Sequence, residues 1–241
     1  MQVKTHGNNL VQLTRLIAFN CFLVREDDGL TLVDTNMGGS ADGILKAARD
    51  LGAPIRRIVL THAHVDHVGS LDALHALLPD AEVMISARDA RFLTGDRSLD
   101  ADEDQMPLRG GYQDCTTQPT RLLQAGDRVG SLEVIASPGH TPGHVAYFDH
   151  RDGTLIAGDA YSTQAGIVTG GSLRLLFPFH ALATWNKPLA VHSGEVLRAL
   201  QPTRLAVGHG RTLENPGAAM DRAIAEAKRH LGNSYASQKA Y

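Results

Sequence analysis

The stretch 61–67, THAHVDH, constrains this chain more than any other feature, because it holds three histidines and an aspartate within six residues. It follows directly after a strand-like apolar run at 55–60. Buried imidazoles need hydrogen-bond partners, and an unpaired buried carboxylate is costly. Metal ligation satisfies all four side chains at once. The predicted ligands from this stretch are His62, His64, Asp66 and His67.

Composition narrows the classes of protein that this chain can be. With 241 residues, of which 43% are hydrophobic, the chain can bury a sizeable core. Its formal charge of -3 gives no general basic surface, so nucleic acid and membranes are not expected as partners. Cys21 and Cys115 form no CxxC pair, so a cysteine metal site is not expected. Neither a signal peptide nor a long apolar run is found, which predicts a cytoplasmic protein, either a monomer or a homodimer.

Apolar periodicity and turn residues predict two similar halves, each with antiparallel strands followed by a helix and a further strand. The predicted strands are 10–17, 22–24, 30–33, 55–60, 82–86, 132–136, 145–148, 154–157 and 205–207. The predicted helices are 41–51, 69–78, 88–93, 189–200 and 216–231. We expect one domain over 1–232, an irregular acidic insertion at 88–120 that is a candidate flap, and a flexible tail at 233–241.

Three further candidate ligands, His140, Asp159 and His209, each follow an apolar strand and have a glycine neighbour. Such positions place side chains at strand ends, where loops converge. The seven ligands divide into two metal sites that share Asp159. One site takes His62, His64 and His140, and the other takes Asp66, His67 and His209. Nitrogen and oxygen ligands without thiolate favour two zinc ions, while iron, manganese or cobalt are compatible with the same cage.

This H-x-H-x-D-H pattern, with the later His, Asp and His each placed after a strand, resembles the metallo-β-lactamase superfamily. The resemblance extends to LVDT at 32–35, SPGHTPGH at 137–144 and GD at 158–159, so it covers nearly the whole chain. It implies a mixed α/β fold, the four-layer αββα sandwich, in which two mixed sheets are faced by helices. The resemblance places the site at one edge between the sheets.

The chemistry of such a site predicts a metal-dependent hydrolase that cleaves a small carboxylic ester, lactone or thioester with a metal-bridging hydroxide. Asp66 is placed to pass a proton to the leaving group. Asp34 is expected to accept a hydrogen bond from a ligand histidine, a role that the resemblance also suggests. His144 is expected to make a structural hydrogen bond. Tyr161 has two open roles, as a catalytic donor to the oxyanion or as a packing residue.

The substrate pocket is expected to take residues from 161–185, and its predicted members are Phe177, Phe179 and His180. This apolar wall fits a small acyl substrate. Lactonases of the family share the whole ligand set and often place a tyrosine soon after the bridging aspartate, although Tyr161 is closer to Asp159 than expected. Thioesterases similar to glyoxalase II share the first motif, but no basic cluster for a glutathione carboxylate is found near the C-terminus.

Other activities on the same fold are alternatives. A secreted β-lactamase usually lacks the bridging aspartate, and an RNA-processing phosphoesterase needs a basic surface. A mononuclear iron persulfide dioxygenase uses two histidines and one carboxylate. Whether Asp66, His67 and His209 bind a second metal ion distinguishes that dioxygenase from a dinuclear hydrolase. A non-catalytic binding protein is disfavoured, because all seven ligands are present.

Overall fold

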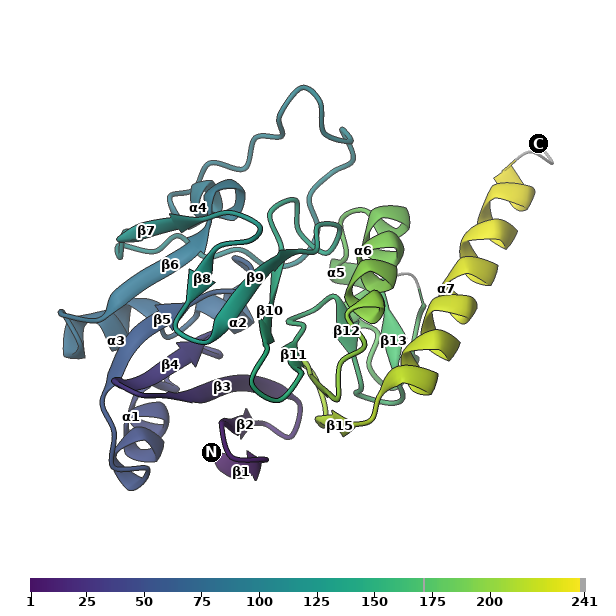
Figure 1. Cartoon of the computed structure of the whole chain (residues 1–241). Coiled ribbons are helices and arrows are strands. Elements are labelled where there is room, and N and C mark those ends of the chain that lie inside the picture. The colour runs from purple at the N-terminus through teal and green to yellow at the C-terminus, as the bar shows by residue number, and fades with distance from the viewer. Residues whose placement is uncertain (171, 239–241) are drawn as a thin grey trace. The chain divides into compact units, whose positions relative to one another are not determined.

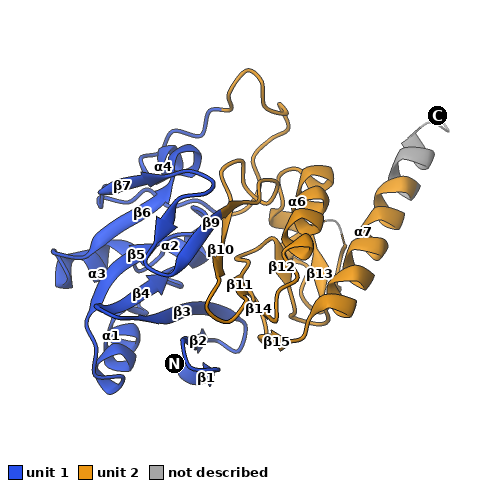
Figure 2. Ribbon diagram, in the orientation of Figure 1, with its two compact units in different colours: residues 1–98, 111–134 blue, residues 99–110, 135–241 orange. Residues whose placement is uncertain are grey.

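The computed structural model describes residues 1–170 and 172–238 (Figure 1). The chain divides into two compact units (Figure 2). Unit 1 contains 1–98 and 111–134, and unit 2 contains 99–110 and the chain from 135 onward. The single domain expected over 1–232 stays a prediction.

Unit 1 is built on a seven-stranded sheet whose strands follow one another in chain order. The strands are β1 (Gln2–His6), β2 (Leu10–Arg15), β3 (Phe19–Glu26), β4 (Gly29–Val33), β5 (Ile55–Val59), β6 (Glu82–Ser86) and β7 (Arg121–Leu123). The first four pair antiparallel, and β4 to β7 pair parallel. The other elements are the helices α1 (Ala41–Asp50), α2 (Val65–Val68), α3 (Leu71–Leu77) and α4 (Ala87–Leu93), and the strands β8 (Arg128–Val129) and β9 (Leu132–Ala136).

The parallel strands explain where polar residues gather in unit 1. Because β4, β5 and β6 run in the same direction, their carboxyl ends meet at one edge of the sheet. Asp34 follows β4, the stretch 61–67 follows β5, and Asp89 lies in the helix that follows β6. The sheet interior is apolar, with residues such as Leu23 and Leu32 fully buried. The fold therefore brings the predicted metal motif and two carboxylates to one edge.

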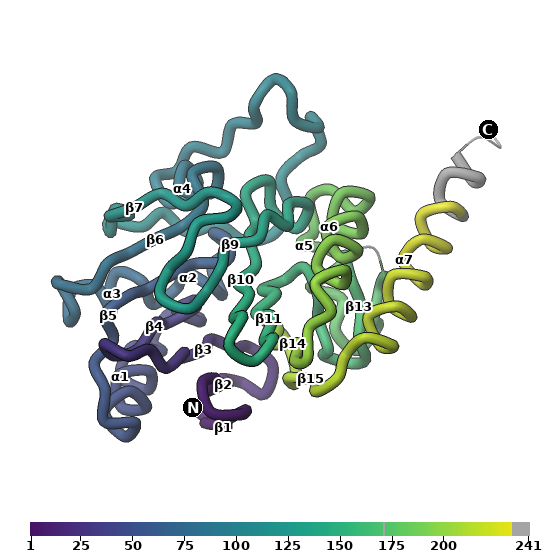
Figure 3. Tube along the Cα trace, viewed as in Figure 1, coloured from purple at the N-terminus to yellow at the C-terminus, as the bar shows by residue number. Residues whose placement is uncertain are grey.

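In unit 2 four strands are neighbours in a mixed sheet, in the order β15-β14-β11-β10, and among these four only β11 and β14 pair parallel. Its strands are β10 (Val145–Asp149), β11 (Thr154–Ile156), β12 (Tyr161–Ser162), β13 (Val168–Thr169), β14 (Arg204–Ala206) and β15 (Leu213–Glu214). Its helices are α5 (Phe179–Ala183), α6 (Lys187–Ala199) and α7 (Gly217–Gln238). The helices α6 and α7 lie side by side and both contact β13 (Figure 3).

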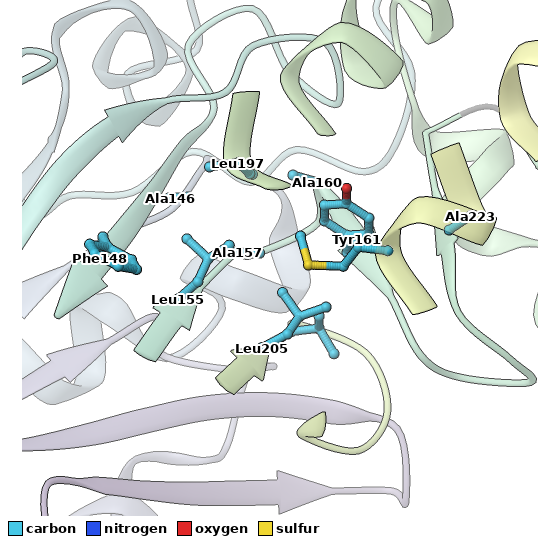
Figure 4. Close-up of a cluster of buried hydrophobic side chains, with 11 residues drawn as sticks. Ala146, Phe148, Leu155, Ala157, Ala160, Tyr161, Leu197, Leu205 and Ala223 are labelled. Atoms are coloured by element: carbon cyan, nitrogen blue, oxygen red, sulfur yellow. The ribbon is translucent and has the colours of Figure 1, made fainter. Parts of the chain in front are cut away.

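The core of unit 2 lies between its sheet and these two helices. Leu155 and Leu205 from neighbouring strands pack with Leu197 of α6 and Ala223 of α7 (Figure 4). Tyr161 belongs to the same cluster and is fully buried. Apolar area removed from water drives this packing.

The long predicted elements are present, and the differences concern short or terminal elements. The last helix continues to Gln238, beyond the predicted end at residue 231. Residues 239–241 of the predicted tail lie outside the described residues. The structure describes the whole segment between α4 and β7. This segment contains no helix or strand, and its single bridge residue is Tyr112. A flap role for 88–120 stays a prediction. Among the described residues, no helix is both long and apolar enough to cross a membrane.

Candidate metal centre

In unit 1, the loop after β5 and the short helix α2 bring the three histidines of the motif together. The Nε2 atom of His62 lies 3.2 Å from the Nδ1 atom of His64. The rings of His62 and His67 are 4.0 Å apart between their centres. Two nitrogen ligands of one tetrahedral zinc ion lie about 3.3 Å apart, given metal–nitrogen bonds of about 2.0 to 2.1 Å. The first distance therefore fits two ligands of the same ion.

A buried pair, Asp34 and Thr61, determines which nitrogen of two histidines carries the lone pair. The Thr61 hydroxyl donates to Asp34 Oδ2 at 2.8 Å, so its oxygen accepts the proton on His62 Nδ1 at 3.0 Å. Asp34 Oδ2 also accepts from His67 Nδ1 at 2.8 Å. Both imidazoles therefore present Nε2 as the ligand atom. This is the contact predicted for Asp34.

Asp66 differs from the other predicted ligands in its exposure. Its side chain is 22% exposed, whereas the other six residues of the set are buried. Asp66 lies in the first turn of α2, and its Oδ2 is 3.8 Å from His67 Nε2. A partly exposed carboxylate beside a ligand histidine can both contact a metal ion and exchange a proton with substrate or water.

Two residues that the sequence analysis did not identify support the motif in unit 1. Buried Asp89 accepts the Ala63 N–H at 3.1 Å, which fixes the backbone between two ligand histidines. The Tyr112 ring lies edge-on to His64 at 4.8 Å between ring centres. Asp89 could have been found from its place in the first turn of a helix that follows a parallel strand. Tyr112 has no such signal, because it lies in an irregular segment.

In unit 2, one carboxylate oxygen lies between two predicted histidine ligands. Asp159 Oδ2 is 3.0 Å from His209 Nε2 and 3.4 Å from His140 Nε2. All three residues are buried. The two histidines were predicted to serve different metal ions, and the oxygen that they share belongs to the predicted bridging aspartate. The structure thus brings Asp159 close to both histidines, and the division of the ligands between two metal ions stays a prediction.

Two buried imidazoles form hydrogen bonds with the backbone of Asp159, one with its N–H group and the other with its carbonyl oxygen. His144 Nε2 accepts the Asp159 N–H at 3.1 Å, while its Nδ1 is 2.8 Å from the Ser137 hydroxyl. His180 Nε2 lies 2.8 Å from the Asp159 carbonyl oxygen and therefore carries the proton of that bond. The structural role expected for His144 is thus a bond to the predicted bridging aspartate.

Thr184 sets the tautomer of His140 in the same way as Thr61 sets that of His62. Its hydroxyl donates to the His180 carbonyl oxygen at 2.7 Å, so it accepts the proton on His140 Nδ1 at 3.0 Å. His140 Nε2 is therefore the nitrogen with the lone pair. The sequence analysis did not identify Thr184, which lies 44 residues from His140 and becomes its partner only through the fold.

Glycines beside two of the ligands allow close backbone approaches. Gly139 has a φ of +128°, and a Cβ atom there would lie 2.2 Å from the Ala190 nitrogen of α6. Gly210 has a φ of +103°, and a Cβ atom there would lie 2.5 Å from the Gln164 nitrogen. No larger residue fits either position without moving backbone. The glycine neighbours noted in the sequence thus serve packing next to the ligands.

The three predicted pocket residues have different environments. Phe177 is buried, and its ring lies 5.2 Å from that of His209. Phe179 is 62% exposed, and its ring contacts that of Phe177 at 5.4 Å between centres. His180 is buried and stacks on His140 at 5.6 Å. Because its ring holds Asp159, His180 supports the site, which corrects the prediction that it lines the pocket.

Tyr161 is a packing residue, so of the two roles left open from the sequence the structure favours packing over the catalytic role. Its ring lies fully buried in the apolar cluster of unit 2 (Figure 4). Its hydroxyl donates to the Gly194 carbonyl oxygen of α6 at 2.7 Å. Burial also raises the pKa of Tyr161 well above its usual value. A phenol engaged in the core is unable to donate to an oxyanion.

Tyr161→Phe is therefore expected to leave kcat and KM unchanged and to lower the free energy of unfolding by about 1 kcal/mol, the net value of one hydrogen bond. Urea unfolding and steady-state kinetics measure the two quantities. A tenfold loss of kcat with unchanged stability would restore the catalytic role.

Comparisons with known proteins identify the family of this chain. The sequence profile of the metallo-β-lactamase superfamily matches residues 18–209. The uncharacterized protein YobT of Bacillus subtilis (strain 168) is 48% identical, over 89% of this chain and 92% of its own length. A hydroxyacylglutathione hydrolase of Aeromonas hydrophila is 34% identical, over 64% of this chain and 53% of its own length.

Solved structures give the same fold. A motif mutant of a metallo-β-lactamase from Cronobacter sakazakii matches with a TM-score of 0.70 and 21% identity, covering 100% of this chain and 99% of its own. This match confirms the predicted metallo-β-lactamase fold, and the mixed sheets and helices of both units are consistent with it. Because the family match spans well over half of the sequence, the chain belongs to the metallo-β-lactamase superfamily.

Proposed function

We propose that this protein is a dinuclear metal-dependent hydrolase that cleaves a small carboxylic ester, lactone or thioester. The single observation that carries the dinuclear site is the position of Asp159 Oδ2, within 3.4 Å of His140 Nε2 and 3.0 Å of His209 Nε2. One oxygen that serves two histidines is what a bridging ligand between two ions requires. Membership of the superfamily supports metal-dependent hydrolysis.

The residues present fit a pair of divalent ions. Hydrogen bonds at Nδ1 make Nε2 the ligand atom of His62, His67 and His140. The donor set contains nitrogen and oxygen only, which suits zinc first and also iron or manganese. In this proposal the seven predicted ligands are divided between two ions as the sequence predicts. The full set is His62, His64, Asp66, His67, His140, Asp159 and His209.

Two bound ions would acidify a water molecule and polarise the carbonyl group that is attacked. The chain supplies the remaining tasks. Asp66, partly exposed, accepts a proton and returns it to the leaving oxygen or sulfur. Asp34 and Thr184 hold the imidazoles in their orientation, so that little reorganisation accompanies turnover.

The acyl substrate is a small molecule, and no nucleic acid is expected to bind. A thioester gains support from the relative of Aeromonas hydrophila, whose name, hydroxyacylglutathione hydrolase, describes a thioesterase. An ester or lactone fits the same chemistry, because each has a carbonyl group and a leaving group that takes one proton.

The decisive experiment combines metal quantitation with a hydrolysis panel of thioesters, lactones, aryl esters, β-lactams and phosphodiesters. The expected result is two divalent ions per chain and turnover of at least one carboxylic substrate. One iron ion per chain together with oxygen consumption on a persulfide would favour the dioxygenase. Turnover of phosphodiesters alone would reject the proposed substrate class.

A further inference from the structure

Unit 2 exposes large apolar side chains in one short segment, 173–182, which we name the apolar segment. Scattered exposed leucines are ordinary on protein surfaces, but several within ten residues form a patch that indicates a binding role. The turn at 175–177 leaves two leucines almost fully exposed, at 87% and 90%. The exposed members are Leu173, Leu175, Leu176, Phe179 and Leu182.

The helix α5 within this segment presents apolar side chains to solvent. Phe179 and Leu182 are three residues apart, so they lie on one face of the helix, and they are 62% and 57% exposed. His180 and Ala181 are buried on the other side. A helix in a water-exposed position normally shows polar residues on its outer face. The outer face of α5 therefore suits an apolar ligand.

The apolar segment reaches the predicted ligands of unit 2. The Phe177 ring lies 5.2 Å from the His209 ring, and the Phe179 ring lies 5.4 Å from that of Phe177. Ring contacts thus lead from a predicted metal ligand through buried Phe177 to the exposed ring of Phe179. A molecule whose reacting carbonyl lies near His209 would have its chain next to these rings.

The charge of the apolar segment points to a neutral ligand. Arg174 is the only residue of the segment that is a lysine, arginine, aspartate or glutamate. Its guanidinium group donates hydrogen bonds to both carboxylate oxygens of Glu226 on α7, at 2.5 and 2.8 Å. An arginine held by a bidentate carboxylate is neutralised as a partner for a second anion. The apolar segment therefore offers no ionic contact to a charged acyl group.

We infer that the apolar segment binds the acyl chain of the substrate, so that the preferred substrates carry a neutral alkyl chain. The assignment of this chain as an acyl chain rests on the proposed function. Continuity with His209 favours the substrate over a second copy of the protein or a membrane, because neither of these needs contact with a ligand histidine.

The test measures binding without turnover. Isothermal titration of the metal-loaded protein with butanamide, hexanamide and octanamide is expected to show affinity rising about threefold for each added methylene group. The double variant Leu175→Ser and Leu176→Ser is expected to lose most of this dependence. A matched double variant in unit 1, Leu77→Ser and Leu122→Ser, removes two leucines that are 57% and 52% exposed and should retain it.

The outcomes separate this inference from the proposed function. Equal affinity for all three amides would overturn the inference, as would a segment variant that changes only the oligomeric state in sedimentation. If affinity rises with chain length but the hydrolysis panel shows no turnover, the chain-binding role stands and the hydrolase assignment fails. If affinity rises with chain length and the panel shows turnover, kcat/KM for thioesters should increase with acyl-chain length in the wild-type protein. In the segment variant, kcat/KM should not depend on chain length.

Discussion

Asp66→Asn is expected to lower kcat at least about 100-fold, the lower range for loss of a positioned acid or base, while the protein remains folded. Asparagine keeps the shape of the side chain but accepts no proton and is a weak metal ligand. Because the Asp66 side chain is 22% exposed and lies in the first turn of α2, the change disturbs no core packing. Steady-state kinetics measures kcat, metal quantitation measures the number of bound ions, and thermal unfolding checks that the protein remains folded. The metal content is expected to fall below two ions per chain.

The matched control is Asp50→Asn, which changes a carboxylate of unit 1 that is 61% exposed and paired with Lys46. Turnover and metal content should be unchanged in this variant, since exposed ion pairs contribute little. An Asp66→Asn protein with two bound ions and full kcat would remove Asp66 from both the ligand set and the proton transfer.

The metal motif was predictable because its information is local. Four ligand side chains within six residues, placed after a β-branched run, identify a site at the end of a strand, and β5 ends at Val59 just before it. The positions of His140 and His209 after strands were predictable for the same reason, and their role as ligands stays a prediction. The strand β6 has the predicted bounds, because its apolar run is short, regular and ends where α4 begins.

The residues that orient the ligands were harder to predict, because their partners lie far away in the chain. Thr184 meets His140, and His180 meets Asp159, only after α5 has folded onto unit 2. Tyr161 follows the predicted bridging aspartate by two residues, and sequence spacing alone was unable to show that its ring enters the core. Strands of two or three residues, such as β12 and β15, are too short for alternation to reveal.

The helix α2 was missed for a different reason. The predicted helix began at residue 69, but the chain turns helical at Val65, inside the motif itself. The ligand pattern masked the helical pattern, because residues 61–67 were interpreted only as a metal motif. Within this helical turn, Asp66 Oδ2 lies 3.8 Å from His67 Nε2.

Asp34→Ala is expected to weaken metal binding about 10- to 100-fold, the usual effect of losing a hydrogen-bond partner of a ligand histidine. Asp34 is buried and accepts from the Thr61 N–H at 2.8 Å and from His67 Nδ1 at 2.8 Å. Its removal leaves these donors unsatisfied, so the free energy of unfolding should fall by at least about 2 kcal/mol. Competition with a chromophoric chelator measures the affinity, and urea unfolding measures the stability. Asp28→Ala, which removes an exposed partner of Arg57, is the control and should change neither.

Asp34→Asn separates the metal effect from the structural one. Asp34 has a φ of +61°, a conformation that asparagine tolerates and alanine does not, so the asparagine variant avoids the backbone strain. An asparagine has a single acceptor oxygen, however, and is unable to serve both the Thr61 N–H and His67 Nδ1–H. Metal affinity should therefore remain reduced while most of the stability returns. If both variants bound metal as tightly as the wild-type protein, the orientation of His67 would be independent of Asp34, and the tautomer argument for the unit 1 ligands would fail.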